Sequence, residues 1–113
     1  MQKTPPTSSK ELQEKIISAT AQYYGIEVEK YKLNTRKAVD NETAYRKHVC
    51  YFMLRQYTFL SYDSIALIFD TGQSTIKCGV NKINDLLTYN RRTIADVMLI
   101  RKVIDNFKEN LKG

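Results

Sequence analysis

Five polar residues along one amphipathic segment carry groups that can form hydrogen bonds with a ligand: Gln73, Ser74, Thr75, Lys77 and Asn81. The segment reads QSTIKCGVNKINDLL, and its large apolar residues recur at helical spacing: Ile76, Val80, Ile83 and Leu87. One side of such a helix is apolar, and the other side presents the polar groups. A glutamine amide pairs with adenine, a lysine ammonium group with guanine, and a hydroxyl group with bases or phosphate. The pattern therefore indicates hydrogen-bond recognition of nucleic-acid bases.

The residues before this segment are typical of the first half of a helix-turn-helix. Ser61 can cap a short helix from Tyr62 to Phe69, and Asp70 to Gly72 can form the turn. The whole unit then covers about residues 62–87, and its second helix would place its N-terminal residues against base edges in a major groove. The alternative interpretation is an ordinary helix pair in a bundle, because such pairs are also joined by short glycine-containing turns.

Three residues of this unit favour close packing of its two helices. Ala66 is small enough to let the second helix cross closely. Ile76 can fill the gap between the helices, and Gly79 offers a second point of close approach. The hydrophobic pattern and the small residues thus predict the same packing.

The net charge of +6 is concentrated in the middle of the chain. Eleven basic and five acidic residues lie between residues 30 and 92, whereas the flanks are balanced. A basic surface of this kind suits a polyanion, and the alternative is a basic face that serves solubility alone. We expect contacts to the DNA backbone or minor groove from six residues: Arg36, Lys37, Arg46, Lys47, Ser61 and Lys82.

Two further helices are predicted on the N-terminal side. Ser8 or Ser9 can cap the first, Gly25 ends it, and its apolar face carries Leu12, Ile16, Ala19 and Tyr23. A central helix begins at Asp40 or Asn41 and ends at Thr58 and Phe59. Its buried stripe is expected to comprise Tyr45, Val49, Phe52, Met53 and Gln56. Between the two helices, residues 26–33 predict a single helical turn.

A last helix is predicted after the helix-turn-helix. Thr93 can cap it, and its apolar residues are Val97, Ile100, Ile104, Phe107 and Leu111. The helix is amphipathic enough to form a homodimer, with packing onto the first helix as the alternative. The chain as a whole is therefore predicted to be all-α: residues 1–8 as a disordered lead-in, and residues 9–113 as one compact bundle of about five or six helices.

Several classes of protein are excluded by the sequence. No apolar run approaches the ~20 residues needed to cross a bilayer, and the N-terminus lacks a signal sequence, so we expect a soluble cytoplasmic protein with no membrane partner. Cys50 and Cys78 have no metal-ligand spacing, so neither a metal site nor a disulfide framework is expected. With His48 as the single histidine and no nucleophile motif, we expect no enzyme activity and no cofactor.

The stretch from Thr43 to Ile83 resembles the C-terminal DNA-binding domain of the bacterial replication initiator DnaA, a helix-turn-helix domain of the Trp-repressor-like kind. Lys47 stands where that family has an arginine leading a helix. Further matches are Tyr57, Thr58, Ser61, Ile65, Phe69, Ser74, Thr75, Ile76, Lys82 and Ile83. Upstream matches at Tyr23, Gly25, Ile26 and Leu33 extend the likeness to roughly residues 12–90. The resemblance implies sequence-specific binding of double-stranded DNA.

The sequence also departs from that family. Gly72 and Gln73 replace an Asp-His pair that helps the family to read its DNA box, and the turn is one residue shorter, so we do not expect the same box. Arg36 or Lys37 could supply the family's basic minor-groove loop, since a narrow A·T-rich groove attracts an inserted arginine. The GxxxxGK[ST] phosphate-binding motif is absent. We therefore expect a regulator or a replication accessory factor without ATPase activity, encoded by a bacterium or a phage.

The alternative function is a protein-interaction module. The chain has eight tyrosines, and tyrosine is favoured at protein interfaces. Against this interpretation, Tyr23 and Tyr45 fall on predicted core stripes. The DNA-binding interpretation is favoured, and the interaction module stays open as its rival.

Overall fold

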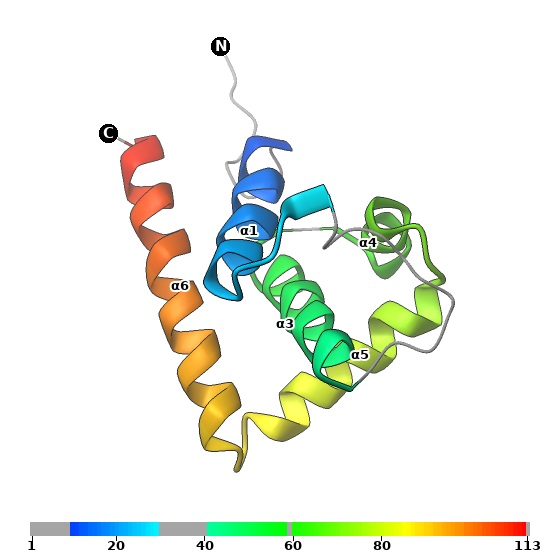
Figure 1. Cartoon of the computed structure of the whole chain (residues 1–113). Helices are drawn as coiled ribbons and strands as arrows, with labels where there is room; N and C mark the ends of the chain where they lie inside the picture. The colour runs from blue at the N-terminus through cyan, green and yellow to red at the C-terminus, as the bar shows by residue number, and fades with distance from the viewer. Residues whose placement is uncertain (1–9, 30–40, 59, 113) are drawn as a thin grey trace.

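The protein is built from helices in the computed structural model, which describes residues 10–29, 41–58 and 60–112, with side chains up to residue 107. The helices are α1 (Lys10–Tyr23), α3 (Asn41–Tyr57), α4 (Tyr62–Phe69), α5 (Gln73–Leu86) and α6 (Arg91–Lys112) (Figure 1). Val28 and Glu29 are also helical, in agreement with the turn predicted over residues 26–33, of which residues 30–33 lie outside the described residues. The described residues contain no strand, and the all-α prediction is confirmed. The predicted disordered lead-in, residues 1–8, lies outside the described residues.

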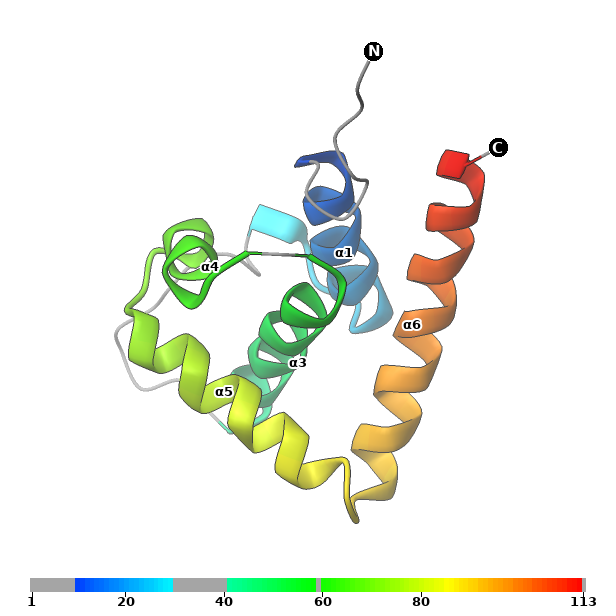
Figure 2. The same cartoon turned by 180° about the vertical axis from the view of Figure 1, so that it is seen from behind.

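α3 is the central helix. Six consecutive residues, Val49 to Leu54, are buried, which requires neighbours on every side of the helix. α1 and α6 lie side by side on one flank of α3, and α4 and α5 lie on the other (Figures 1 and 2). The prediction of a central helix at this position is therefore confirmed.

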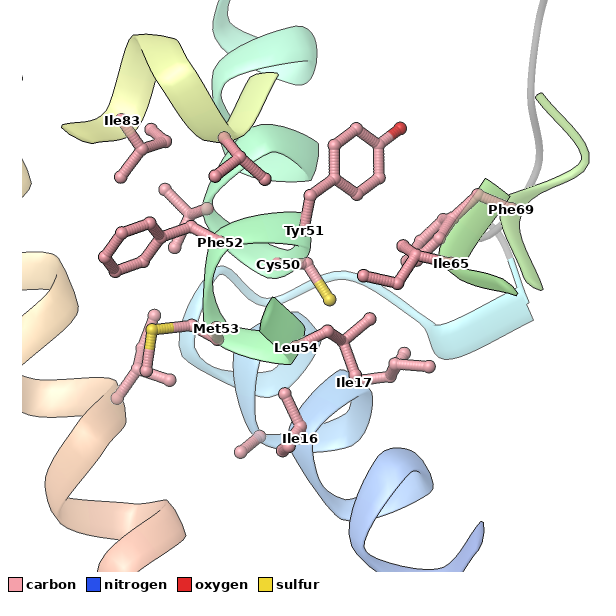
Figure 3. Close-up of a cluster of buried hydrophobic side chains, with 14 of the residues drawn as sticks. Ile16, Ile17, Cys50, Tyr51, Phe52, Met53, Leu54, Ile65, Phe69 and Ile83 are labelled. Carbon is pink, nitrogen blue, oxygen red and sulfur yellow. The ribbon is translucent and has the colours of Figure 1, made fainter. Parts of the chain in front are cut away.

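The buried apolar residues of all five helices form one cluster. Figure 3 shows Ile16 of α1, Leu54 of α3 and Phe69 of α4 in that cluster, and each is at most 1% exposed. Fully burying a side chain of this size stabilises a fold by about 1.5–3 kcal/mol relative to leaving it exposed. The common core fixes the positions of α4 and α5, which carry the candidate site.

Gly25 ends α1, as predicted. Its backbone is in the left-handed region (φ 70°), where a glycine has no steric penalty. The amide of Gly25 donates to the carbonyl of Gln22 at 3.0 Å, and the amide of Ile26 donates to the carbonyl of Ala21 at 2.9 Å. This pair of hydrogen bonds is a Schellman motif, which satisfies carbonyl groups at the helix end.

Two predicted core stripes are partly wrong. Leu12, Ile16 and Ala19 of α1 are buried, but Tyr23 at the end of that stripe is 39% exposed. Gln56, at the end of the α3 stripe, is also exposed. Both residues lie in the last turn of their helix.

The N-cap of α6 is Asn90 and not Thr93 as predicted. The Oδ1 atom of Asn90 accepts hydrogen bonds from the amide of Thr93 at 2.9 Å and from its hydroxyl at 3.1 Å. Asparagine and threonine both suit an N-cap, so residue type alone does not choose between them. Thr93 is instead 1% exposed and belongs to the inner side of α6.

The inner side of α6 otherwise agrees with the prediction. Val97, Ile100 and Ile104 are at most 2% exposed, and Phe107 is packed against the core. Leu111 lies outside the residues whose side chains are described. The sequence left two possibilities for this helix, a homodimer contact or packing onto the first helix. In the structure α6 packs along α1.

Candidate nucleic-acid interface

The polar residues that open α5 are on the surface. Gln73, Ser74 and Thr75 form its first turn, and all three side chains are exposed. α5 begins directly after Gly72, whose extended backbone (φ −90°, ψ 156°) carries no capping side chain. The first turn is closed by a backbone hydrogen bond from the amide of Thr75 to the carbonyl of Gly72 at 3.1 Å. This end of α5 is therefore open to a ligand.

Polar and apolar residues occupy opposite sides of α5. The inner side consists of buried residues: Ile76, Gly79, Val80 and Ile83. The outer side is a shallow open depression lined by Ser74, Lys77, Cys78, Asn81, Lys82 and Asp85. Lys77 and Asn81 are exposed, and with Ser74 they form one continuous face that runs from the N-terminal turn. All five residues predicted to read bases thus lie on the surface of one helix.

A three-residue turn places α5 relative to α4, as predicted. Asp70 adopts left-handed backbone angles (φ 53°, ψ 53°), which aspartate tolerates better than most residues. The amide of Thr71 donates to the carbonyl of Ala66 at 3.0 Å and closes the end of α4. At the other end, Ser61 is the N-cap: its Oγ accepts a hydrogen bond from the amide of Ser64 at 3.1 Å. Both ends of α4 are therefore defined by local hydrogen bonds.

Close packing beneath α5 involves the three residues that the sequence singled out. Ala66 is 5% exposed, and Ile76 is fully buried between α5 and the rest of the core. Gly79 faces α3, where a β-carbon at this position would lie 3.0 Å from Cδ2 of Tyr51 and closer still to His48. The absence of a side chain at Gly79 therefore sets how closely α5 approaches α3.

His48 lies at this crossing, beside Lys82 in a small hollow between α3 and α5. Burial lowers the pKa of His48, and the positive charge of Lys82 lowers it further. Since the ordinary pKa of histidine is about 6.5, the imidazole is neutral at physiological pH. His48 therefore contributes packing, and Lys82 is the exposed cation at this crossing.

The cations of α3 differ in their surroundings. Arg46 is held in an ion pair, with Nε 2.8 Å from a carboxylate oxygen of Glu42, and its guanidinium carbon lies 5.4 Å from the ring centre of Tyr24. Arg92 of α6 binds the same carboxylate through two nitrogens. Lys47 is half-buried, and burial lowers its pKa. The DNA contacts predicted for Arg46 and Lys47 stay predictions.

Three further residues were expected to contact the DNA backbone or minor groove. Ser61 is exposed, at the start of α4, and its hydroxyl is used as the helix cap. Arg36 and Lys37 lie outside the described residues. None of these contacts is tested by the geometry, and they too stay predictions.

A polar cluster that the sequence did not predict surrounds Asp96, which is 5% exposed on the inner side of α6. Its carboxylate accepts hydrogen bonds from the hydroxyls of Tyr23 at 2.7 Å, Tyr24 at 2.8 Å and Tyr45 at 2.8 Å. A signal was present, because Asp96 falls on the same helical stripe as Val97 and the isoleucines of α6. The cluster joins α6 to α1 and α3, and so supports the core behind the interface.

Most of the described tyrosines are engaged inside the protein. Besides the three at Asp96, Tyr51 is buried, Tyr57 donates to Asp105 at 2.8 Å, and Tyr62 lies under the guanidinium group of Arg55. Tyr89, at 68%, is the most exposed tyrosine among the described residues. A continuous tyrosine surface is therefore absent from the part of the chain that the structure describes.

Two kinds of site are missing from the described residues. They contain no group of three or more histidine, cysteine, aspartate or glutamate residues that could hold a metal ion. None of the helices, within the same ranges, is long and apolar enough to cross a membrane.

Comparison with known proteins identifies a family for this geometry. The family model described as "Bacterial dnaA protein helix-turn-helix" matches residues 13–83. The match covers more than half of the chain, from α1 to the buried Ile83 of α5. A search of curated proteins finds no match.

Proposed function

Because the chain belongs to the bacterial DnaA helix-turn-helix family, a family of DNA-binding domains, we propose that it recognises specific sequences in double-stranded DNA by inserting the N-terminal part of α5 into the major groove. One observation carries the proposal: Gln73, Ser74 and Thr75 are exposed at the start of α5, while the opposite side of that helix is buried.

The roles of the reading residues follow from their chemistry. The amide of Gln73 can make two hydrogen bonds with an adenine, and the ammonium group of Lys77 can donate to a guanine. Ser74 and Thr75 can bond a base or a phosphate oxygen. Asn81 lies one turn beyond Lys77 on the exposed face, so it reads the base at the far end of the contact.

The backbone contacts come from cations next to α5. Lys82 is exposed on α5 itself, and Lys47 lies on α3, the helix against which α5 packs. Arg36 and Lys37 supply the basic loop that enters the minor groove. Arg46 contributes least, because a phosphate must compete with Glu42 for its guanidinium group. Ser61, at the start of α4, turns its hydroxyl hydrogen from the Oγ of Ser64 to a phosphate oxygen.

The biological role that this site supports is regulation of transcription or assistance to replication in the cytoplasm of a bacterium or an infecting phage. These 113 residues contain no GxxxxGK[ST] motif, so the proposed activity is DNA binding without ATP hydrolysis. No catalytic constellation among the described residues favours an enzymatic function.

The test is the salt dependence of binding to a generic duplex. A protein that neutralises about six phosphates loses roughly a thousand-fold in affinity between about 50 and 200 mM salt. Lys47→Ala should weaken binding to all sequences and make the salt slope shallower by about one unit. Lys10→Ala is the matched control, because Lys10 is an exposed lysine at the start of α1, and it should leave the slope unchanged. Absence of binding at low salt would overturn the proposal.

A further inference from the structure

The outer side of α6 carries apolar side chains that no described residue covers. Met98 is 56% exposed, Leu99 48% and Val103 45%, and the small residue Ala95 is exposed one turn before them. The inner side of the same helix is buried in the core through Val97, Ile100 and Ile104, so α6 is apolar on two sides. Helices of this kind are normally covered on both sides.

These residues form a stripe rather than a scatter. Ala95, Leu99 and Val103 are four residues apart, and Met98, three residues after Ala95, flanks this row at one edge. Elsewhere in the described residues the large exposed apolar side chains stand apart from one another: Tyr23, Leu67 and Tyr89. Single exposed apolar residues are normal, whereas a contiguous stripe marks an interaction site. Figures 1 and 2 show α6 at the edge of the molecule, with α1 on its inner side and no described helix beyond it.

Charged residues beside the stripe indicate which partner binds it. Arg91, Met98 and Asp105 are seven residues apart, so they lie along one edge of the stripe with a positive end and a negative end. Two antiparallel copies of α6 that cross at Met98 would bring Arg91 of each copy opposite Asp105 of the other. The same arrangement places Met98 next to its own copy and the small Ala95 opposite Arg101, with Leu99 beside the crossing. The face is therefore complementary to itself, as a twofold interface requires.

We propose that the protein forms a homodimer through this face, with two α6 helices antiparallel around Met98 and Leu99. One helix pair buries less area than the roughly 1,000 Å² of a strong interface, and Lys102 lies among the apolar residues. The dimer is accordingly weak, with a dissociation constant in roughly the micromolar range. The inference goes beyond DNA binding, because it requires only α6.

Self-association also affects DNA binding. This consequence, unlike the dimer itself, rests on the proposed function. The α6 face lies beyond the C-terminal end of α5, whereas Gln73 lies at its N-terminal end, so both copies keep their reading residues exposed. Two copies related by a twofold axis would read two half-sites in inverted orientation.

The test is analytical ultracentrifugation of the full chain, without DNA, from micromolar to millimolar concentration. The expected result is a monomer–dimer equilibrium, and Leu99→Glu should raise the dissociation constant at least tenfold. Leu67→Glu is the matched control, because Leu67 is 82% exposed on α4, and it should leave the equilibrium unchanged. A wild-type protein that stays monomeric throughout, or a dimer indifferent to Leu99→Glu, would overturn the proposal.

A charge exchange tests the antiparallel register. Arg91→Asp and Asp105→Arg should each weaken the dimer, because each places like charges opposite one another. The double variant restores the Arg–Asp pairing in the opposite sense and should restore the dimer. If the double variant did not recover the dimer, the proposed antiparallel register would be wrong. Circular dichroism checks that each variant is folded, and binding to a short duplex with one site, measured separately, shows whether DNA binding is retained when the dimer is lost.

Discussion

The imidazole ring of His48 lies against the backbone of Gly79, where a β-carbon would come within 2.6 Å of its Cδ2 atom. This contact joins the central helix α3 to the helix that carries the candidate reading residues. The ring is also tilted against Tyr51, with ring centres 5.9 Å apart. The position of α5 therefore depends on a glycine that itself makes no contact with a ligand.

Gly79→Ala should destabilise the protein by about 1–2 kcal/mol. Overpacking a filled core costs typically 1–3 kcal/mol, and the better helix propensity of alanine offsets up to about 1 kcal/mol of it. Chemical denaturation measures the change in the free energy of unfolding. Gly72→Ser is the matched control, because nothing lies within 4 Å of a β-carbon at Gly72 and serine is a better N-cap residue than glycine. Equal stability of the two variants would contradict the proposed role of Gly79.

Gln73→Ala should reduce discrimination between DNA sequences by about 1–3 kcal/mol and leave the fold intact, because the side chain is exposed and its amide is assigned to a base. Selection of bound duplexes from a random pool, followed by sequencing, measures the loss of preference. Gln22→Ala, an exposed glutamine on α1, is the control and should retain the wild-type preference. If Gln73→Ala also retained it, Gln73 would be removed from the reading set.

Glu42 should make stability sensitive to acid. Hydrogen bonds from Arg92 and Arg46 lower the pKa of Glu42 to about 2. A carboxyl group with a lowered pKa stabilises the fold above its unfolded pKa of about 4.3, and this contribution is lost as the pH falls towards 2. The difference in unfolding free energy between wild type and Glu42→Gln should therefore shrink from pH 5 to pH 2. A difference that does not change with pH would argue against the ion pairs.

Asp96→Asn should destabilise the protein by about 2–4 kcal/mol. The neutral amide replaces one carboxylate oxygen with a donor, so the hydroxyls of Tyr23, Tyr24 and Tyr45 can no longer all be accepted. Asp105→Asn is the control on the same helix, because Asp105 is exposed and accepts a hydrogen bond from the hydroxyl of Tyr57. Thermal unfolding of both variants measures the loss of stability. If Asp96→Asn lost no more stability than Asp105→Asn, the prediction would be wrong.

The same cluster should be visible in a tyrosine titration. The hydrogen bond to Asp96, followed by burial, raises the pKa of Tyr23 to about 12. A raised pKa means that the contribution to stability is complete below about pH 10, the unfolded value, and is lost as the pH rises through 12. In Asp96→Asn the pKa of Tyr23 should fall towards 10. Ultraviolet absorbance of the phenolate follows the titration. An unaltered titration curve in Asp96→Asn would show that Asp96 does not raise the pKa of Tyr23.

Residues close together in the sequence determined much of this protein. The ends of α4 were predicted to the residue, because Ser61 caps one end by a hydrogen bond three residues away and the turn at Asp70 closes the other. The buried side of α5 was also predicted, since Ile76, Val80 and Ile83 repeat with the period of a helix. These features depend on backbone geometry over a few residues, which the local sequence contains.

Tertiary structure alone decided which side chains meet between helices. Arg46 appeared equivalent to Lys47 in the sequence, but the packing of α3 near α6 places Glu42 between Arg46 and Arg92. Asp96 lies more than 70 residues from Tyr23 and Tyr24, and no local pattern records their contact. Periodicity specifies which side of a helix is buried, whereas the choice of partner depends on the arrangement of all the helices in space.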